Sequence, residues 1–152
     1  MIIIKMKHIN HNEKCLCTIS SSSELEKIRN FVILCAEKFG FDDKESHNIA
    51  LAVDEACSNL IRYGFKYNSK HDIQVNISSN DEHKFVVSIS DNALPFNPTK
   101  VESPNMEEYF RQFKKGGLGI HLMKLVMDEI DYIPKSKNNP RNTLLLKKYL
   151  KI

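Results

Sequence analysis

The sequence predicts an α/β fold, a two-layer sandwich in which a mixed, mostly antiparallel sheet carries helices on one face. The chain has 152 residues, which is enough for one ordinary hydrophobic core. Segments typical of strands and helices follow one another in the order β-α-α-β-β-loop-α-β-β. Helices that precede and separate antiparallel strands are typical of a sheet covered on one face. We therefore expect a single domain over residues 1–152.

Residues 13–20 predict the first strand, because apolar and polar side chains alternate along them. Residues 1–12 are expected to form an N-terminal extension or a further strand. The next segment predicts a helix that is capped by Ser22 or Ser23 and ends at Gly40. Its apolar side chains recur at intervals of three and four residues and would form one stripe: Leu25, Ile28, Val32, Cys35 and Phe39.

A second helix is predicted to begin after a cap at Asp42 or Asp43 and to run to about Gly64. Residues 71–79 and 84–91 each alternate with a period of two and are separated by a short polar turn. That pattern is typical of a β-hairpin.

Residues 92–116 contain three prolines without sustained periodicity and predict a long loop, and loops of this length are often functional. A third helix is expected from Ile120 to about Glu129. Two strands around residues 130–134 and 143–150 would complete the sheet.

The net charge is small: the chain has 22 Lys and Arg and 19 Asp and Glu, which gives +3. A nucleic-acid-binding domain usually has a stronger or more concentrated basic excess, so we expect no direct nucleic-acid partner. The apolar runs are too short for a secretory signal or for a membrane span, which needs about 18 residues. We therefore expect a cytoplasmic protein without membrane contact. The cysteines lack zinc-site spacing and are interpreted as small buried side chains: Cys15, Cys17, Cys35 and Cys57.

One candidate functional pair lies in the second predicted helix. Glu55 and Asn59 are four residues apart, so their side chains are neighbours on the helix surface. They flank the apolar face beside Ala52 and Ala56, whose small side chains leave room for a bound group. An amide oxygen suits Mg²⁺, and a carboxylate can accept a proton. The alternative is that the pair forms an ordinary solvated helix edge.

A second candidate is the glycine turn Gly116–Gly119 at the start of the third predicted helix. Glycines let the backbone approach an anion closely, and the free N–H groups of a helix N-terminus favour phosphate. Any helix entry can carry glycines, however, and the spacing of a P-loop is missing.

A third candidate is Asp91 at the end of a predicted strand, followed by an apolar loop. Its carboxylate could accept a hydrogen bond from an exocyclic amine such as that of adenine. The alternative is an aspartate that only initiates a turn, which is common.

The three segments together, in this order, resemble the Bergerat-fold ATPases, the family of gyrase and the histidine kinases. Within that family the chain is similar to the anti-sigma-factor serine kinases. The resemblance covers residues 13–150 and implies the Bergerat ATP-binding fold. The segments that match the family's motifs are Asp54–Asn59, Asp91–Pro98, Gly116–Ile120 and Asn142–Leu144.

The resemblance implies ATP and Mg²⁺ as cofactors. Glu55 would be the general base that activates a serine hydroxyl on a protein substrate, and Asn59 would be the Mg²⁺ ligand. Residues 97–116 would form a lid over ATP, where Arg111, Lys114 and Lys115 are candidate cations for the γ-phosphate. The positions expected to bind the nucleotide are Asn59, Asp91, Ala93, Lys115, Gly117, Leu118, Gly119 and Thr143. Of these, Asp91 and Thr143 would lie near the adenine.

One position departs from the family pattern, because Ala93 stands where the motif has glycine. If that glycine uses a positive φ or lets the base approach closely, alanine costs about 1 kcal/mol or more there. We therefore expect Ala93 to weaken nucleotide binding.

The resemblance implies an ATP-dependent serine-protein kinase that acts as an anti-sigma factor. Its partners would be a sigma factor and a STAS-type anti-sigma-factor antagonist that it phosphorylates on serine, and the chain would form a homodimer. The alternative function is a nucleotide-binding regulatory module that sequesters a protein partner without phosphoryl transfer. Ala93 favours the alternative, whereas Glu55 favours the kinase.

Overall fold

The computed structural model describes residues 13–100, 102 and 118–151. Its five strands form one sheet in the order β1-β2-β3-β5-β4. Their bounds are Glu13–Ile19 for β1, Asp72–Asp81 for β2, Lys84–Asp91 for β3, Glu129–Ile133 for β4 and Asn142–Tyr149 for β5. Each pairing between these described strands is antiparallel, so the sheet is antiparallel where a mixed, mostly antiparallel one was expected.

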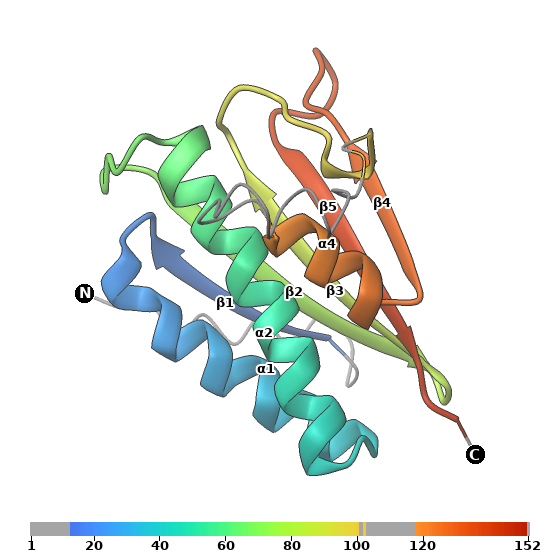
Figure 1. Cartoon of the computed structure of the whole chain (residues 1–152). Helices are drawn as coiled ribbons and strands as arrows, with labels where there is room; N and C mark the ends of the chain where they lie inside the picture. Colours follow the sequence, from blue (N-terminus) through green and yellow to red (C-terminus); the bar gives the residue numbers. More distant parts are fainter. Residues whose placement is uncertain (1–12, 101, 103–117, 152) are drawn as a thin grey trace, which may run out of the picture.

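The helices α1 (Leu25–Phe39), α2 (Asp43–Asn59) and α4 (Gly119–Val126) lie together on one face of the sheet (Figure 1). The predicted two-layer α/β sandwich is therefore confirmed. The opposite face of the sheet carries no helix among the described residues. Within the described ranges no helix is both long and apolar enough to cross a bilayer.

The helix starts follow from local hydrogen bonds. Asp42 caps α2, because its Oδ1 accepts a hydrogen bond from the backbone N–H of Glu45 at 2.7 Å. The cap before α1 was predicted one or two residues too late. Ser21 accepts from the N–H of Ser23 at 3.4 Å, and a short 3-10 turn, Ser22–Glu24, precedes the helix.

The second predicted helix reaches Gly64, but its last turn is wider than an α-helical one. Residues Leu60–Gly64 form a π turn, in which the N–H of Phe65 donates to the carbonyl of Leu60 at 2.9 Å. Such turns occur often at functional sites. Lys66 and Tyr67 follow with positive φ values of 49° and 62° and turn the chain away from the helix.

The core lies between the helices and the inner face of the sheet. In α1 the buried stripe is the predicted one, with Ile28, Val32 and Cys35 buried and Leu25 and Phe39 partly buried against them. Burying one large apolar side chain contributes about 1.5–3 kcal/mol, so this face holds the two layers together. The sheet and α2 supply the remaining main members: Ile73, Val75, Ile77, Phe85, Val87, Ile89, Leu144, Leu146, Ile49, Val53 and Cys57.

The outer face of the sheet holds two of the cysteines predicted to be buried. Cys35 and Cys57 are buried, but Cys15 and Cys17 are half-buried because they alternate with the inward-facing Leu16. Burial raises the pKa of Cys57, and nearby carboxylates add to the rise, so it stays a thiol.

The third predicted helix is shorter than expected. It ends at Val126, because Met127 already has an extended backbone (ψ 145°), and Glu129 begins β4. The described part of the predicted loop is irregular apart from a short 3-10 turn at Pro98–Lys100. Residues 101 and 103–116 of that loop lie outside the described residues.

A cluster around Arg141 ties three strands together before β5 begins. Its guanidinium donates to Asp72 Oδ1 at 3.1 Å, to the Ser90 carbonyl at 2.9 Å and to Ser90 Oγ at 3.3 Å. Partial burial alone would raise the pKa of Asp72, but the hydrogen bond and charge of Arg141 hold it below its ordinary value. The ionised form of Asp72 is therefore stabilised in the folded state.

Replacing Asp72 with Asn should lower the free energy of unfolding at pH 7 by no more than about 1 kcal/mol, because the side chain is partly exposed and the pair is screened by water. A depressed folded pKa contributes stability above the unfolded pKa of about 4 and loses it as the pH falls through the folded value. Urea unfolding of both proteins from pH 7 to pH 3 should show the difference shrinking at the acid end. Glu37→Gln, at an exposed position on α1, is the control, and an unchanged difference at pH 3 would contradict the assignment.

Candidate functional site

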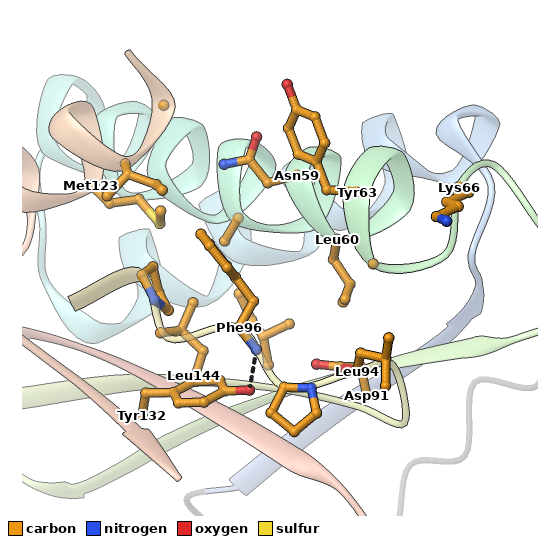
Figure 2. Close-up of a pocket in the computed structure, with 17 residues that line it drawn as sticks. Asn59, Leu60, Tyr63, Lys66, Asp91, Leu94, Phe96, Met123, Tyr132 and Leu144 are labelled. Atoms are coloured by element: carbon orange, nitrogen blue, oxygen red, sulfur yellow. Dashed lines mark hydrogen bonds between the residues drawn. The ribbon is translucent and has the colours of Figure 1, made fainter. Parts of the chain in front are cut away.

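A cavity of about 550 Å³ opens between the helical layer and the sheet. Figure 2 shows Asn59, Leu60 and Tyr63 on the helical side, and Tyr132 and Leu144 on the sheet side. Its volume lies within the range of small-molecule sites, about 300–1,000 Å³. The cavity is mostly apolar, so its few polar groups decide what it can bind.

Asp91 is the buried carboxylate of this cavity and stands at the end of β3. It is 8% exposed. Its Oδ1 accepts two hydrogen bonds, from the N–H of Ala93 at 2.8 Å and from Nδ2 of Asn142 at 3.0 Å. No donor among the described residues is recorded for Oδ2, so this oxygen can accept a hydrogen bond from a ligand.

Glu55 and Asn59 meet the start of α4 at Gly119. A Cβ placed on Gly119 would overlap Oε2 of Glu55 and would lie 3.4 Å from Nδ2 of Asn59. A side chain at position 119 would therefore force the carboxylate of Glu55 away from the start of α4. A carboxylate near a helix N-terminus is electrostatically favourable. The structure thus brings together a proton acceptor, a hard oxygen ligand and the N-terminus of a helix.

The neighbouring carboxylate of Asp54 forms an ion pair within the helical layer and does not face α4. Arg29 of α1 donates to its Oδ1 at 2.9 Å, which ties α1 to α2. Of these two adjacent carboxylates, Glu55 is therefore the one that faces the start of α4.

Asn59 would be the protein's ligand for a metal ion in this cavity. Among the described residues no cluster of three or more His, Cys, Asp or Glu side chains could hold a metal ion. A bound Mg²⁺ fits such a site because it usually keeps several waters and takes few protein ligands beside phosphate oxygens.

Ala93 does not carry the strain expected of it. In the described part of the chain, the residues other than glycine with a positive φ are Lys66 and Tyr67, so position 93 has no need of glycine's backbone freedom. The Ala93 side chain is buried against the π turn, where a Cβ on Gly64 would lie 3.2 Å from the Cβ of Ala93. Because Gly64 has no Cβ, the π turn leaves room for the side chain of Ala93.

Thr143 is placed differently from the expectation. It pairs with Ser90 and Ile133, and its neighbours Asn142 and Leu144 face the core, so its side chain points to the outer face of the sheet. It does not line the cavity. Asn142, one residue earlier, contacts Asp91 instead. The alternation with the buried Leu144 is the signal that could have shown this in the sequence.

Other residues of the site were not singled out from the sequence. The N–H of Phe96 donates to the hydroxyl of Tyr132 at 3.0 Å, which fixes the loop after β3 against β4 (Figure 2). Burial raises the pKa of Tyr132 more than this hydrogen bond lowers it, and the charge of Asp91 raises it further. Lys66 also lines the cavity and carries its nearest described cation.

The structure describes only part of the predicted glycine turn and none of the predicted lid cations. Leu118 immediately precedes α4 and Gly119 begins it. Gly117 and the expected lid cations Arg111, Lys114 and Lys115 lie outside the described residues.

Comparison with known proteins shows the family. A family model described as a histidine kinase-like ATPase domain matches residues 20–148. The serine-protein kinase RsbW of Bacillus subtilis is 25% identical over 118 residues, which cover 76% of this chain and 71% of that protein. The serine-protein kinase RsbW of Oceanobacillus iheyensis is 23% identical over 119 residues, which cover 76% of this chain and 72% of that protein.

Solved structures show the same fold at lower identity. The RsbU and RsbW domains of a Mycobacterium tuberculosis protein match with a TM-score of 0.62 at 13% identity, over 92% of this chain but only 33% of that one. The SiaB–SiaC complex of Pseudomonas aeruginosa matches with a TM-score of 0.62 at 15% identity, over 90% of this chain and 88% of that one. The matched residues make up most of the sequence, so the chain belongs to the histidine kinase-like ATPase domain family, and its predicted resemblance to the Bergerat-fold anti-sigma kinases is confirmed.

Proposed function

We propose that this chain is an ATP-dependent serine-protein kinase that acts as an anti-sigma factor and phosphorylates a STAS-type antagonist on serine. The observation that carries the proposal is a cavity lined by Asp91, Asn59 and Gly119, with the carboxylate of Glu55 beside Gly119. Asp91 offers a free carboxylate oxygen for a base, while Glu55 and Asn59 meet at Gly119, where phosphates would be held. The names of the RsbW relatives support a serine-protein kinase.

Asp91 would select the base. Its Oδ2 would accept a hydrogen bond from the exocyclic amine of adenine, and the apolar walls of the cavity would cover the faces of the ring. Met123 from α4 and Ile89 and Leu144 from the sheet supply those walls. A carboxylate oxygen without a protein donor favours a ligand that brings one, because a ligand that displaces water from this oxygen must replace the hydrogen bonds that the water made.

Glu55 would accept the proton of the substrate serine as its oxygen attacks. ATP with Mg²⁺ supplies the phosphoryl group and neutralises the charge that develops during its transfer. Asn59 would hold the metal through its amide oxygen, and the N–H groups at the start of α4 would bind phosphate oxygens. Positioning and electrostatics would therefore account for most of the rate.

The proposal also covers the domain extent, the lid, the cellular location and the partners of the chain. One domain over residues 1–152 would include a lid at residues 97–116 with Lys115 near the phosphates. The chain would work in the cytoplasm as a homodimer that exchanges a sigma factor for its antagonist. The SiaB–SiaC complex, a structural neighbour, supports the idea that this fold binds a protein partner.

The alternative of a regulatory module without phosphoryl transfer depended on Ala93. Because Gly64 leaves room for its side chain and its φ is not positive, backbone strain at Ala93 no longer argues for weak nucleotide binding. The kinase is therefore the function that we propose.

Replacing Glu55 with Gln should leave ATP binding within about threefold but slow phosphoryl transfer by about 10²–10⁴-fold, because the proton acceptor is lost while the shape is kept. Calorimetry measures binding. Transfer of labelled phosphate from ATP to the STAS-domain proteins encoded in the same genome measures activity.

Glu37→Gln, at an exposed position on α1, is the matched control and should transfer phosphate at the wild-type rate. Full transfer by Glu55→Gln would remove Glu55 as the base. Binding of ATP by the wild type without transfer to any STAS-domain protein would instead support the regulatory module.

The contact between Gly64 and Ala93 can be tested with a double-mutant cycle. Gly64→Ala should lower the free energy of unfolding by about 1–3 kcal/mol through overpacking and weaken ATP binding. Ala93→Gly alone should cost about 1 kcal/mol or less. The double variant should recover part of the loss, because the two Cβ atoms no longer meet. Strict additivity in urea unfolding and calorimetry would show that the two positions do not share this space.

A further inference from the structure

Asn142 is a fully buried amide at the first position of β5, directly opposite Asp91 in the register of the sheet. Its Nδ2 donates to Asp91 Oδ1 at 3.0 Å and to the carbonyl of Ala93 at 2.8 Å. Its Oδ1 accepts from the backbone N–H of Lys135 at 2.9 Å. Both amide hydrogens and the amide oxygen are therefore occupied by the protein.

The surrounding groups allow only one orientation of this amide. Nδ2 faces a carboxylate and a carbonyl, which can only accept, whereas Oδ1 faces an N–H, which can only donate. Turning the amide over would place acceptor against acceptor and donor against donor. The orientation of Asn142 is therefore set by its surroundings and not by a ligand.

This network also sets the orientation of Asp91. Oδ1 is held by Asn142 on one side and by the N–H of Ala93 on the other. A carboxylate with one oxygen held at two points cannot rotate freely, so its other oxygen keeps a fixed direction. Asp91 lines the cavity, and Asn142 does not.

We infer that Asn142 is a positioning residue that aims Oδ2 of Asp91 at the base while offering the ligand no hydrogen-bonding group of its own. The inference rests on the proposed function and goes further, because it assigns the orientation of that carboxylate oxygen to Asn142, a residue that does not line the cavity. The expected consequence is selection for a purine with an amino group at position 6. A 6-oxo purine would place an acceptor against Oδ2.

The test compares the affinities for ATP and ITP, which differ at this edge of the base, by calorimetry. The wild type should bind ATP at least about tenfold more tightly than ITP, as expected for a hydrogen bond to a charged group. Asn142→Ala should reduce this ratio to about threefold or less, because Asp91 is free to rotate. Asn142→Thr should restore most of it, since a hydroxyl can still donate to Oδ1.

Two controls separate positioning from a general loss of structure. In an Asp91→Asn background, Asn142→Ala should leave the ATP-to-ITP ratio unchanged, because the group through which it acts is already gone. Thr143→Val, on the opposite face of the sheet, should leave the wild-type ratio unchanged. Without nucleotide, the side-chain amide protons of Asn142 should exchange slowly with solvent in NMR spectra of the wild type.

The outcomes distinguish the inference from the proposed function. Equal losses of ATP and ITP affinity in Asn142→Ala would overturn the positioning role while leaving ATP binding intact as a proposal. A ratio lowered by Thr143→Val, or rapidly exchanging Asn142 amide protons, would also overturn it. A wild type that binds neither nucleotide would overturn the proposed function and this inference with it.

Discussion

The hydrogen bond between Asn142 and Asp91 joins β3 and β5 at the point where both reach the cavity. A buried carboxylate without partners would be costly, so the loops around it are arranged to supply donors. Ala93 gives its N–H to Asp91, and Lys135 gives its N–H to Asn142. The segments that follow β3 and precede β5 are thereby held against the end of the sheet, and the floor of the cavity depends on this one buried pair.

The helical wall contains two close approaches at glycines. Gly64 in the π turn leaves room for Ala93, and Gly119 at the start of α4 leaves room for Glu55. Each contact brings a segment from elsewhere in the sequence against the end of α2. The wider turn after Asn59 and the missing Cβ atoms together determine how closely the helical layer approaches the loop and the sheet. A larger residue at position 64 would crowd Leu60 and Ala93, whereas one at position 119 would displace the carboxylate of Glu55.

Much of the fold could be predicted from the sequence, because periodicity reports directly on burial. The stripe of α1, the hairpin of β2 and β3 and the one-sided helical layer all follow from it. Helix ends were less predictable: α4 ends at Val126 because β4 begins soon after it, a tertiary constraint that local propensity does not contain. The sequence motifs singled out Asp91, Glu55 and Asn59, and the structure places Asp91 and Asn59 on the cavity wall and Glu55 beside Gly119.

The misplacement of Thr143 shows where sequence reasoning failed and why. A motif gives the identity of residues, but in a strand a shift of one position moves a side chain to the other face. Leu144 and Leu146 are buried, so Asn142 must share their face and Thr143 must not. Asn142 is then a polar residue on an otherwise apolar face, paired with another polar residue, Asp91. Two buried polar side chains opposite each other break the pattern of a core, and such breaks are expected at functional sites. Reading strand alternation together with the motif would therefore have located the buried pair that fixes the carboxylate of Asp91 at the cavity.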